Sequence, residues 1–493
     1  MVRIIKIYEK IVHLRPFGFW PGFVVGLVYF SYTLWWFWSG YTYISTLLGT
    51  ANNSLAFLII FPTFIFTVVG VSMFWGLFSW IIFKFHPKTK TGFMPFFCAV
   101  TFVLLEYART WFVAIILYGN GGLLGAHWTF GNPAYLLSGL KLIRQSASYW
   151  GIYGVDFVMV FIGTAIFMLA QTWLKKQKSV FVIEILLAII VVILLNLMTS
   201  TKNSENKLSI SEIQTQNPIE ISDSPEKFLS DFSQKNKLLQ EASKKSDIVI
   251  FPESSDFSKN LSRFLDPASI PKYFANLAPK NILVIDSNRV PEQEELKSKV
   301  VLIDSKDGVV GSYDKRLLTP GGEYYPYISK LALWFFGYFF KNDLAPFSAV
   351  FNQGYNSNVL DYKDNKIKVL VCSDIVSPSI SREGDFNFMV NLRNLGVFGG
   401  NDLMEKQLFS MARFRSAENG KYLVISSNFG HSYVLNQSGD IIKSTHSKGY
   451  QLLTADIVPN KKQTWYNKLG DLPILLLSLA IFGLGIKSLK NEH

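Results

Sequence analysis

Long apolar stretches flank one long polar segment, and this arrangement constrains the fold of the chain more than any other feature. Residues 1–200 are dominated by Phe, Leu, Ile, Val and Trp and contain very few acids, whereas residues 201–465 have the mixed composition of a soluble α/β domain. At 493 residues the chain is too long for one ordinary domain. We therefore predict a transmembrane bundle of about five helices in 1–200, a soluble domain in 201–465, and a transmembrane helix with a cytoplasmic tail in 466–493.

Six apolar runs approach the roughly twenty residues that a helix needs to cross about 30 Å of hydrocarbon. They are Phe17–Trp38, Leu55–Phe83, Phe93–Tyr118, Tyr153–Leu174, Val180–Leu197 and Leu472–Ile486. The last run is short and reaches spanning length with its flanks. The first run lacks the small-residue cleavage site of a signal peptide, because Trp, Phe and Tyr crowd its end.

The distribution of positive charge predicts the orientation of these spans. Lysine and arginine collect before the first span, after the second and fourth, and at the end of the chain: Arg3, Lys6, Lys10, Arg15, Lys84, Lys88, Lys90, Lys175, Lys176, Lys178, Lys487 and Lys490. Because positive residues collect in cytoplasmic loops, we expect both termini inside the cell and residues 201–470 outside. The net charge of +12 follows from this pattern, and no basic face with interleaved aromatic residues indicates nucleic-acid binding.

Two charged residues, Glu106 and Arg109, interrupt the third apolar run. Their spacing of three puts them on one face of a helix. Ionisable groups at membrane depth cost several kcal/mol unless they are paired. We interpret them as a structural ion pair; a contact to lipid headgroups or substrate is the alternative.

Short β-rich runs alternate with helical stretches in the polar segment. Several runs are apolar on successive residues, which indicates central strands covered on both faces. The predicted strands are Leu208–Ile213, Asp247–Phe251, Asn281–Asp286, Lys299–Asp304, Lys366–Val371, Phe386–Leu392, Tyr422–Ser427, Ser432–Leu435 and Gln451–Ile457, and the predicted helices are Glu226–Lys244 and Leu403–Asn419. No Gly-x-Gly-x-x-Gly is present, so we predict an α/β layered sandwich rather than a Rossmann domain.

Residues able to perform acyl transfer stand near the strand ends of this segment. Glu253 and Cys372 each lie at the carboxyl end of a predicted strand, and Lys315 follows the strand 299–304 by a turn; active sites in α/β sheets gather at such ends. A thiol needs a base before it becomes nucleophilic, and Glu253 can supply one. Attack on a carbonyl creates an oxyanion, which Lys315 can stabilise. Glu323 can hold the lysine or Glu253 in place.

Three motifs carry a resemblance to a known family. Phe-Pro-Glu-Ser at 251–254, Tyr-Asp-Lys-Arg-Leu-Leu-Thr-Pro-Gly-Gly-Glu-Tyr-Tyr-Pro at 313–326 and Val-Leu-Val-Cys at 369–372 resemble the motifs of the nitrilase (carbon–nitrogen hydrolase) superfamily. With membrane spans on both sides, the chain resembles the bacterial apolipoprotein N-acyltransferases. Further short motifs fit this resemblance at 105–109, 149–154, 379–382, 391–394, 407, 411–413 and 415–418.

The resemblance implies a nitrilase-like αββα sandwich in which Glu253 is the general base, Lys315 stabilises the tetrahedral intermediate, Cys372 is the nucleophile and Glu323 supports them. It implies transfer of a fatty acyl chain from a phospholipid, through a Cys372 thioester, to the N-terminal amine of the S-diacylglyceryl-cysteine of an apolipoprotein. The expected partners are that donor, that acceptor and membrane lipids, without nucleic acid, metal or cofactor. The expected location is the bacterial cytoplasmic (inner) membrane, with several spans and with the catalytic domain on the periplasmic side.

The aromatic segment Leu331–Phe340 is too short to span a membrane. We interpret it, with the family resemblance, as a mobile arm that dips into the lipid surface and covers the acyl chain; a buried helix of the sandwich is the alternative. The residues expected to bind substrate are Trp334, Phe335, Phe336, Asp374 and Phe398.

Several positions depart from the family pattern: Ser373 and Asp374 replace an aromatic residue and a glutamate, Leu395 and Val397 replace an acid and a tryptophan, and Leu408 replaces a histidine. These departures leave room for a divergent activity. A membrane-tethered amidase or nitrilase that hydrolyses a C–N bond uses the same three residues and would release ammonia or an amine. A non-catalytic lipoprotein-binding relative would form no acyl thioester on Cys372.

Overall fold

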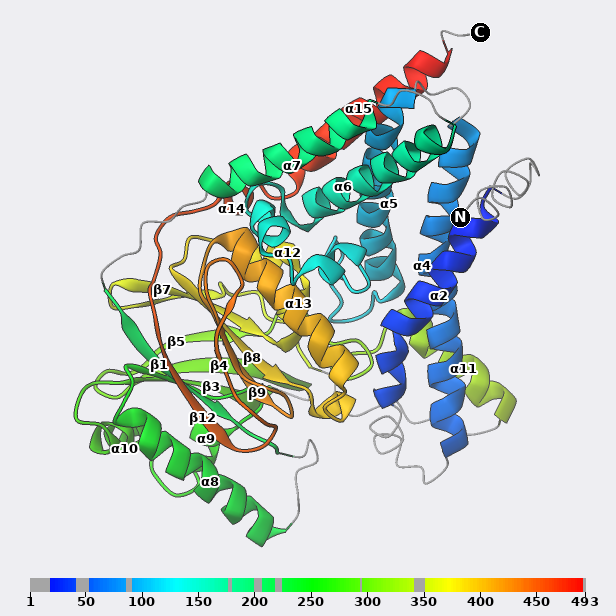
Figure 1. The fold of residues 1–493 in the computed structure, drawn as a ribbon. Coiled ribbons are helices and arrows are strands. Elements are labelled where there is room, and N and C mark those ends of the chain that lie inside the picture. Colours follow the sequence, from blue (N-terminus) through cyan, green and yellow to red (C-terminus); the bar gives the residue numbers. More distant parts are fainter. Residues whose placement is uncertain are drawn as a thin grey trace.

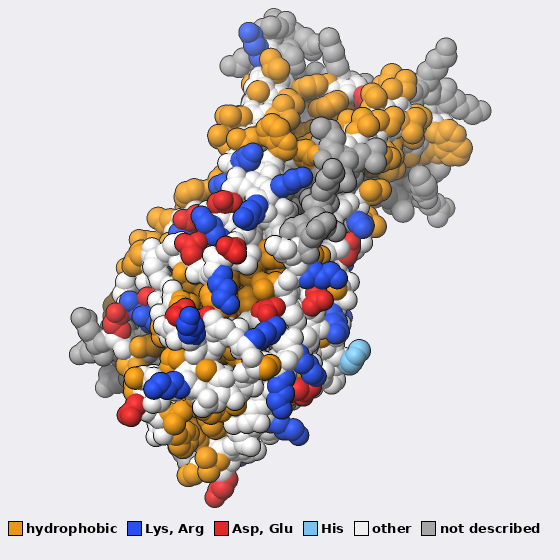
Figure 2. Space-filling view, turned by 90° about the vertical axis from the view of Figure 1, so that its left-hand side faces the viewer, with side chains coloured by type: hydrophobic (Ala, Val, Ile, Leu, Met, Phe, Trp, Pro, Cys, Tyr) orange, Lys and Arg blue, Asp and Glu red, His pale blue; other side chains and the backbone are white. Residues whose placement is uncertain are grey.

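The computed structural model describes residues 18–40, 53–85, 91–175, 180–198, 206–217, 224–292, 295–340 and 351–490. The described residues form a helical part and a β-sandwich that share one boundary (Figure 1). In Figure 2, hydrophobic side chains gather over the helical end of the molecule, whereas charged side chains are spread over the sandwich. This contrast agrees with the composition change near residue 200.

The helical part contains six apolar helices among the described residues: α2 (Trp20–Thr33), α4 (Asn53–Phe85), α5 (Met94–Ile116), α6 (Lys141–Leu174), α7 (Phe181–Met198) and α15 (Leu472–Lys490). By length and composition, three described helices can cross a membrane, namely Ile60–Phe85, Met94–Ile116 and Lys141–Leu174. Shorter apolar helices cover Phe181–Leu194 and Leu472–Lys487. The first predicted span is divided, since α2 gives way to the 3-10 helix η1 (Trp35–Gly40). The predicted domain limits and the number of spans stay predictions.

Helix α6 begins at Lys141, well before the predicted start of the fourth span at Tyr153, and it bends at Gly151. This residue has φ 67° and ψ −168°, a conformation that favours glycine. A Cβ built on Gly151 would lie 2.1 Å from the ring of Tyr466. The bend therefore requires glycine both for the backbone and for the close approach of the tyrosine ring, which belongs to the segment that joins the sandwich to α15.

The sandwich consists of two six-stranded sheets. The first has the order β12-β1-β2-β3-β4-β5 and the second β11-β10-β9-β8-β7-β6. The strands are β1 (Leu208–Gln214), β2 (Ile248–Ile250), β3 (Leu283–Glu292), β4 (Glu295–Asp304), β5 (Gly308–Asp314), β6 (Val359–Tyr362), β7 (Asn365–Val371), β8 (Phe388–Asn394), β9 (Leu423–Asn428), β10 (Tyr433–Leu435), β11 (Ile441–Ser444) and β12 (Gln451–Ile457). The centres of both sheets, β1-β2-β3 and β7-β8-β9, are parallel.

Helices cover the outer face of each sheet. Helices α8 (Pro225–Ser243), α9 (Phe257–Leu261) and α10 (Ile270–Leu277) pack on the first sheet through one apolar cluster. Helices α12 (Pro378–Arg382) and α13 (Asp402–Asn419) pack on the second. A further buried cluster fills the space between the sheets. The predicted αββα sandwich is confirmed.

All nine predicted strands are present, and three strands were missed. The missed strands β5, β6 and β11 lie at sheet edges. An edge strand has fewer covered neighbours, so its sequence needs no continuous apolar run; β5 carries two glycines, and Val309 and Val310 on it are exposed. The predicted position of Lys315 was therefore wrong in one respect: it follows β5 directly, not β4 by a turn.

Helix α13 lies between the second sheet and the membrane helices (Figure 1). One buried cluster joins Val103 of α5 and Ile152 of α6 to Leu408 and Met411 of α13 and to Met389 of β8. The sandwich and the helical part therefore share a hydrophobic core, and this core fixes the strand ends of the second sheet against the helices.

Candidate active site

Strand ends position the three predicted catalytic residues. Glu253 follows β2, Lys315 follows β5 and Cys372 follows β7, where it begins the 3-10 helix η6 (Cys372–Val376). Cys372 has φ 43°, in the left-handed region that residues other than glycine rarely adopt. Such strain persists where the surrounding structure imposes it, and it is common at functional sites. The two sheets thus bring a carboxylate, an ammonium and a thiol to one side of the sandwich.

Lys315 lies between two carboxylates. Its Nζ is 2.8 Å from Glu253 Oε1 and 2.9 Å from Glu323 Oε1. Glu323 Oε2 also accepts a hydrogen bond from the backbone N–H of Thr319, at 2.6 Å. Lys315 is 2% exposed, so these charges interact with little screening by water. The structure therefore brings Glu323 to the lysine, in the supporting position that the sequence predicted.

Cys372 completes the group. Its Sγ donates to the backbone oxygen of Asn394, at 3.7 Å, and the charge of Glu253 acts on the thiol. The charge of Lys315 also acts on the thiol. Glu253 thus pairs with Lys315 and acts on the Cys372 thiol, and all three side chains are buried.

Burial dominates the electrostatics of these groups. It raises the pKa of the Cys372 thiol to about 12, with a further rise from Glu253 and an opposing effect of Lys315. Burial also raises the pKa of Glu253, against the lowering effect of Lys315. Burial alone would lower the pKa of Lys315, but Glu253 and Glu323 outweigh it and raise that pKa well above its usual value. The thiol is therefore protonated at neutral pH and needs a base when it attacks.

Asp374 was predicted to bind substrate, but its carboxylate has another set of partners. It accepts hydrogen bonds from Tyr313 Oη and from the backbone N–H groups of Leu317 and Val371, each at 2.9 Å. The side chain is fully buried, and burial raises its pKa. Asp374 lies outside the residues that line the pocket described below. In the structure it connects the Cys372 loop to the loop that carries Lys315.

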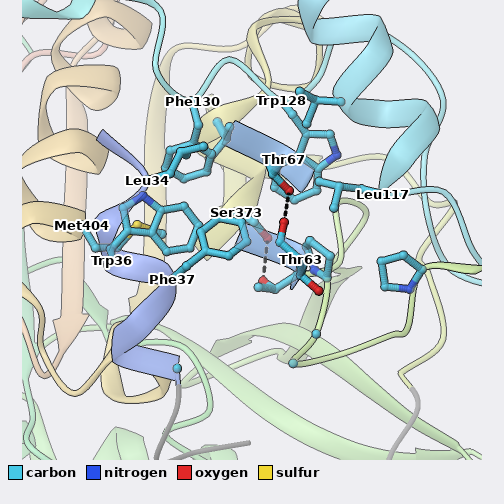
Figure 3. A pocket seen from close by; sticks show the side chains of 18 of the residues that line it. Leu34, Trp36, Phe37, Thr63, Thr67, Leu117, Trp128, Phe130, Ser373 and Met404 are labelled. Carbon is cyan, nitrogen blue, oxygen red and sulfur yellow. Dashed lines mark hydrogen bonds between the residues drawn. The ribbon is translucent and has the colours of Figure 1, made fainter. Parts of the chain in front are cut away.

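Cys372 opens into an apolar pocket, called here the Cys372 pocket, with a volume of about 190 Å³. Figure 3 shows Trp36, Phe37 and Met404 on one side, Leu117 on the other, and Ser373 with Thr63 and Thr67 between them. Its walls come from α2, η1, α4, α5, the 319–329 segment, η6 and α13. The lining residues are Phe30, Leu34, Trp36, Phe37, Gly40, Ile60, Thr63, Thr67, Val71, Arg109, Val113, Leu117, Trp128, Phe130, Thr319, Pro320, Gly321, Gly322, Tyr325, Pro326, Ser329, Cys372, Ser373, Val376, Val397, Phe398, Met404 and Leu408.

The remaining predicted substrate-binding residues fall into two groups. Phe398 lines the Cys372 pocket and contacts Trp36, with 5.4 Å between ring centroids. Trp334 and Phe335 lie on α11 (Tyr327–Phe340), are 68% and 49% exposed, and do not line the pocket. The side chain of Phe336 lies outside the described residues. The exposure of Trp334 excludes the alternative of a buried sandwich helix; α11 instead lies beside α4 (Figure 1).

Sequence reasoning missed most of the pocket wall. Trp36 and Phe37 of η1 and Thr63 and Thr67 of α4 were assigned to membrane spans without a site role. The one signal that the sequence offered was that Thr63 and Thr67 lie four residues apart, so they share one face of a helix. Ser373, a departure from the family pattern, lines the pocket beside Cys372, and its hydroxyl donates to the backbone oxygen of Leu317.

Glu106 and Arg109 form the predicted ion pair. Arg109 Nη2 is 2.8 Å from Glu106 Oε2, and both side chains are 1% exposed. Arg109 Nη1 also donates to the backbone oxygen of Phe130, at 3.0 Å. Arg109 nevertheless lines the Cys372 pocket, so the structural pair is part of the wall of the site. Among the described residues, no three His, Cys, Asp or Glu side chains gather so as to hold a metal ion.

Comparison with known proteins identifies the family. The sequence profile of carbon-nitrogen hydrolases matches residues 216–467, which is half of the chain. The chain belongs to the carbon-nitrogen hydrolase family. The match includes Glu253, Lys315 and Cys372 and ends just before α15. The apolar helices at 18–198 lie outside the carbon-nitrogen hydrolase part.

Relatives that match both parts are named apolipoprotein N-acyltransferases. The protein of that name from Borreliella burgdorferi is 24% identical over 85% of this chain and 82% of its own. The one from Geobacter metallireducens is 23% identical over 91% of this chain and 83% of its own. Among solved structures, a carbon-nitrogen hydrolase superfamily protein from Xanthomonas campestris is 16% identical, covers 57% of this chain and 97% of its own, and has a TM-score of 0.39.

Proposed function

We propose that the protein is an apolipoprotein N-acyltransferase that takes a fatty acyl chain from a phospholipid onto Cys372 and passes it to an apolipoprotein. The observation that carries the proposal is the Cys372 pocket: a buried thiol beside a carboxylate and a lysine opens into an apolar space walled by membrane helices. A small polar amide has no need of such walls, whereas an acyl chain does. The names of the relatives support the same function.

In the first step Glu253 takes the thiol proton while Sγ attacks the ester carbonyl of the phospholipid. A C–S bond forms, and the carbonyl oxygen gains the negative charge, which the ammonium of Lys315 stabilises. The tetrahedral intermediate collapses by breaking the bond between the carbonyl carbon and the glycerol oxygen. Glu253 returns its proton to that oxygen, so lysophospholipid leaves and the acyl chain stays on Cys372 as a thioester.

In the second step the α-amine of the S-diacylglyceryl-cysteine of the apolipoprotein attacks the thioester carbonyl. A C–N bond forms, the C–S bond breaks, and Glu253 carries a proton from the amine to the departing sulfur. Thioesters react readily with amines, and the apolar walls of the Cys372 pocket keep water from hydrolysing the intermediate. The products are N-acylated lipoprotein and free Cys372.

The proposed location is the bacterial inner membrane. Residues 1–200 and the helix within 466–493 would hold the protein in the bilayer, with residues 201–465 on the periplasmic side, as the lysine and arginine distribution indicates. Both substrates are lipids in that bilayer. Helix α11, with Trp334 and Phe335 exposed, would rest on the lipid surface at the edge of the site, and Phe398 would contact the bound chain.

The decisive experiment is to incubate the purified protein with a phospholipid that carries a labelled acyl chain. We expect the label on Cys372 by intact-protein mass and peptide mapping, together with release of one lysophospholipid for each labelled thiol. Cys372→Ala should abolish both. Cys98→Ala is the matched control, because Cys98 is the other cysteine of the chain, lies in α5 and should not affect labelling. Release of ammonia or amine from amide substrates without a label on sulfur would contradict the proposal and favour an amidase.

A further inference from the structure

We propose that the deep end of the Cys372 pocket selects the length of the acyl chain, and that Val71 is the residue that sets this limit. The inference rests on the proposed function, because it concerns the chain that Cys372 would carry. Three features of the pocket support it: its elongated shape, its closed end, and the position of Val71 at that end.

The pocket follows one face of α4. Its lining residues on this helix are Ile60, Thr63, Thr67 and Val71, at spacings of three and four. Such spacing marks a single stripe along a helix. At a rise of 1.5 Å per residue, the stripe extends over about 16 Å. The pocket is therefore a trough along α4, a shape that suits an extended hydrocarbon chain.

Helix α5 forms part of the opposite wall and shows which end is deep. It contributes Arg109 and Val113, and Leu117 follows the helix. The backbone oxygen of Leu117 accepts a hydrogen bond from Tyr324 Oη, at 2.7 Å, in the segment that follows Lys315. Leu117 thus marks the end near Cys372. Arg109 lies two turns further into the helical part, so the trough runs from the sandwich inward between α4 and α5.

A rigid layer closes the inner end. The guanidinium of Arg109 lies over the ring of Phe30, 5.3 Å from its centroid, and pairs with Glu106. Glu106 also accepts a hydrogen bond from Trp75 Nε1, at 3.1 Å. The centroids of the Trp75 and Phe30 rings are 5.3 Å apart. All of the charge in this layer is paired. Moving Arg109 or Glu106 alone would leave a buried charge without its partner, so the layer resists displacement by an incoming chain.

Val71 is the innermost pocket residue on α4, one turn before Trp75. Its side chain is 1% exposed, and α4 continues beyond it to Phe85. The last methyl group of a bound chain would meet Val71, Phe30 and Arg109. One turn of helix is about 5.4 Å, the length of about four methylene groups, so a larger side chain at position 71 should remove about that much of the trough.

The test compares chain-length preference in three variants. Each purified protein is given phosphatidylethanolamines that differ in the length of their saturated chains, and the initial rate of acyl-thioester formation on Cys372 is followed by mass. Val71→Phe should lower the ratio of the rates for long and short chains by about tenfold or more, the scale on which a closed hydrophobic pocket rejects an excess methylene. Val71→Ala should shift the preference toward longer chains.

Val69→Phe is the matched control. It makes the same change on the same helix, but Val69 is 38% exposed and does not line the pocket, so the length preference should not change. If both Val71 variants label Cys372 with the length preference of the unaltered protein, Val71 sets no limit. If Val71→Phe fails to fold, Val71→Ala alone decides. If the unaltered protein acquires no label from any chain length, that result contradicts the proposed function itself. It is distinct from the result that contradicts the role of Val71, in which label is acquired with an unchanged length preference.

Discussion

At the scale of single residues, the site depends on a balance between burial and two opposing charges. Glu253 is pushed toward its neutral form by burial and by Glu323, and toward its charged form by Lys315. Because a base must be ionised to accept the thiol proton, the proposed first step should slow as the pH falls through the pKa of Glu253. That pKa is raised, so the decline should begin at a higher pH than for an ordinary glutamate.

The substitution Glu323→Gln should shift the pKa of Glu253 in one direction, downward. The substitution removes a negative neighbour of Glu253 and leaves Lys315 with Glu253 as its charged partner. Both changes lower the pKa of Glu253, so the acid limb of the pH–rate profile for thioester formation should move to lower pH, while the rate at the plateau falls because Lys315 is held less firmly. A reduced plateau with an unmoved acid limb would show that Glu323 acts on the lysine alone.

Residue types and motif spacing were sufficient to predict Glu253, Lys315, Glu323 and Cys372 as one group, because acyl transfer onto sulfur needs a base, a cation and a thiol. The same reasoning assigned substrate binding to Asp374, whose carboxylate instead connects two loops. The sequence does not distinguish a carboxylate that points toward the substrate from one that accepts hydrogen bonds from the backbone, because both can stand beside the nucleophile. Its direction depends on the path of the Lys315 loop, which comes from a different sheet.

At the scale of elements, Gly151 is the position where one residue decides the path of a helix. Its φ of 67° and the ring of Tyr466 exclude a side chain. Gly151→Ala should therefore lower the melting temperature of the detergent-solubilised protein, by several degrees for a loss of about 1–3 kcal/mol. Gly163→Ala, in the same helix, is the control, since nothing lies within 4 Å of a Cβ there. Equal melting temperatures for the two variants would mean that the bend tolerates a side chain.

Elements with a strong periodic pattern were predicted well, and elements without one were not. The central strands and the long helix α13 appear where they were expected, because covered strands and amphipathic helices need regular apolar spacing. The edge strands β5, β6 and β11 were missed because one side of each needs little apolar surface. The division of the first span into α2 and η1 was missed for another reason: Trp35–Gly40 is as apolar as the helix before it, and its turn follows from packing against Phe398 and α13.

At the scale of the whole molecule, the sandwich and the membrane helices share the core around α13, so we expect them to unfold together. Phe414 of α13 is fully buried against Tyr135, with ring centroids 5.6 Å apart. Phe414→Ala should cost about 3–5 kcal/mol and lower a single melting transition reported both by sandwich and by helix probes. Phe264→Ala is the control, because Phe264 is 55% exposed and its ring contacts Phe232 of α8, away from the core around α13. Separate transitions for the two parts would contradict this description.

The sequence by itself determined the local features: apolar runs, central strands, and three motifs, two of which place Glu253 and Cys372 at the ends of predicted strands. The apolar runs and the central strands depend on composition and periodicity over short stretches of sequence, and the motifs are identified by their resemblance to a known family. The tertiary structure decided the rest. The Cys372 pocket joins residues from position 30 to position 408, and its closed end needs Phe30, Trp75, Glu106 and Arg109 together. The contacts between α2, α4 and α5 depend on how all three helices pack together. An apolar stripe on one helix can be recognised in the sequence, but the sequence does not show which other helix packs against it.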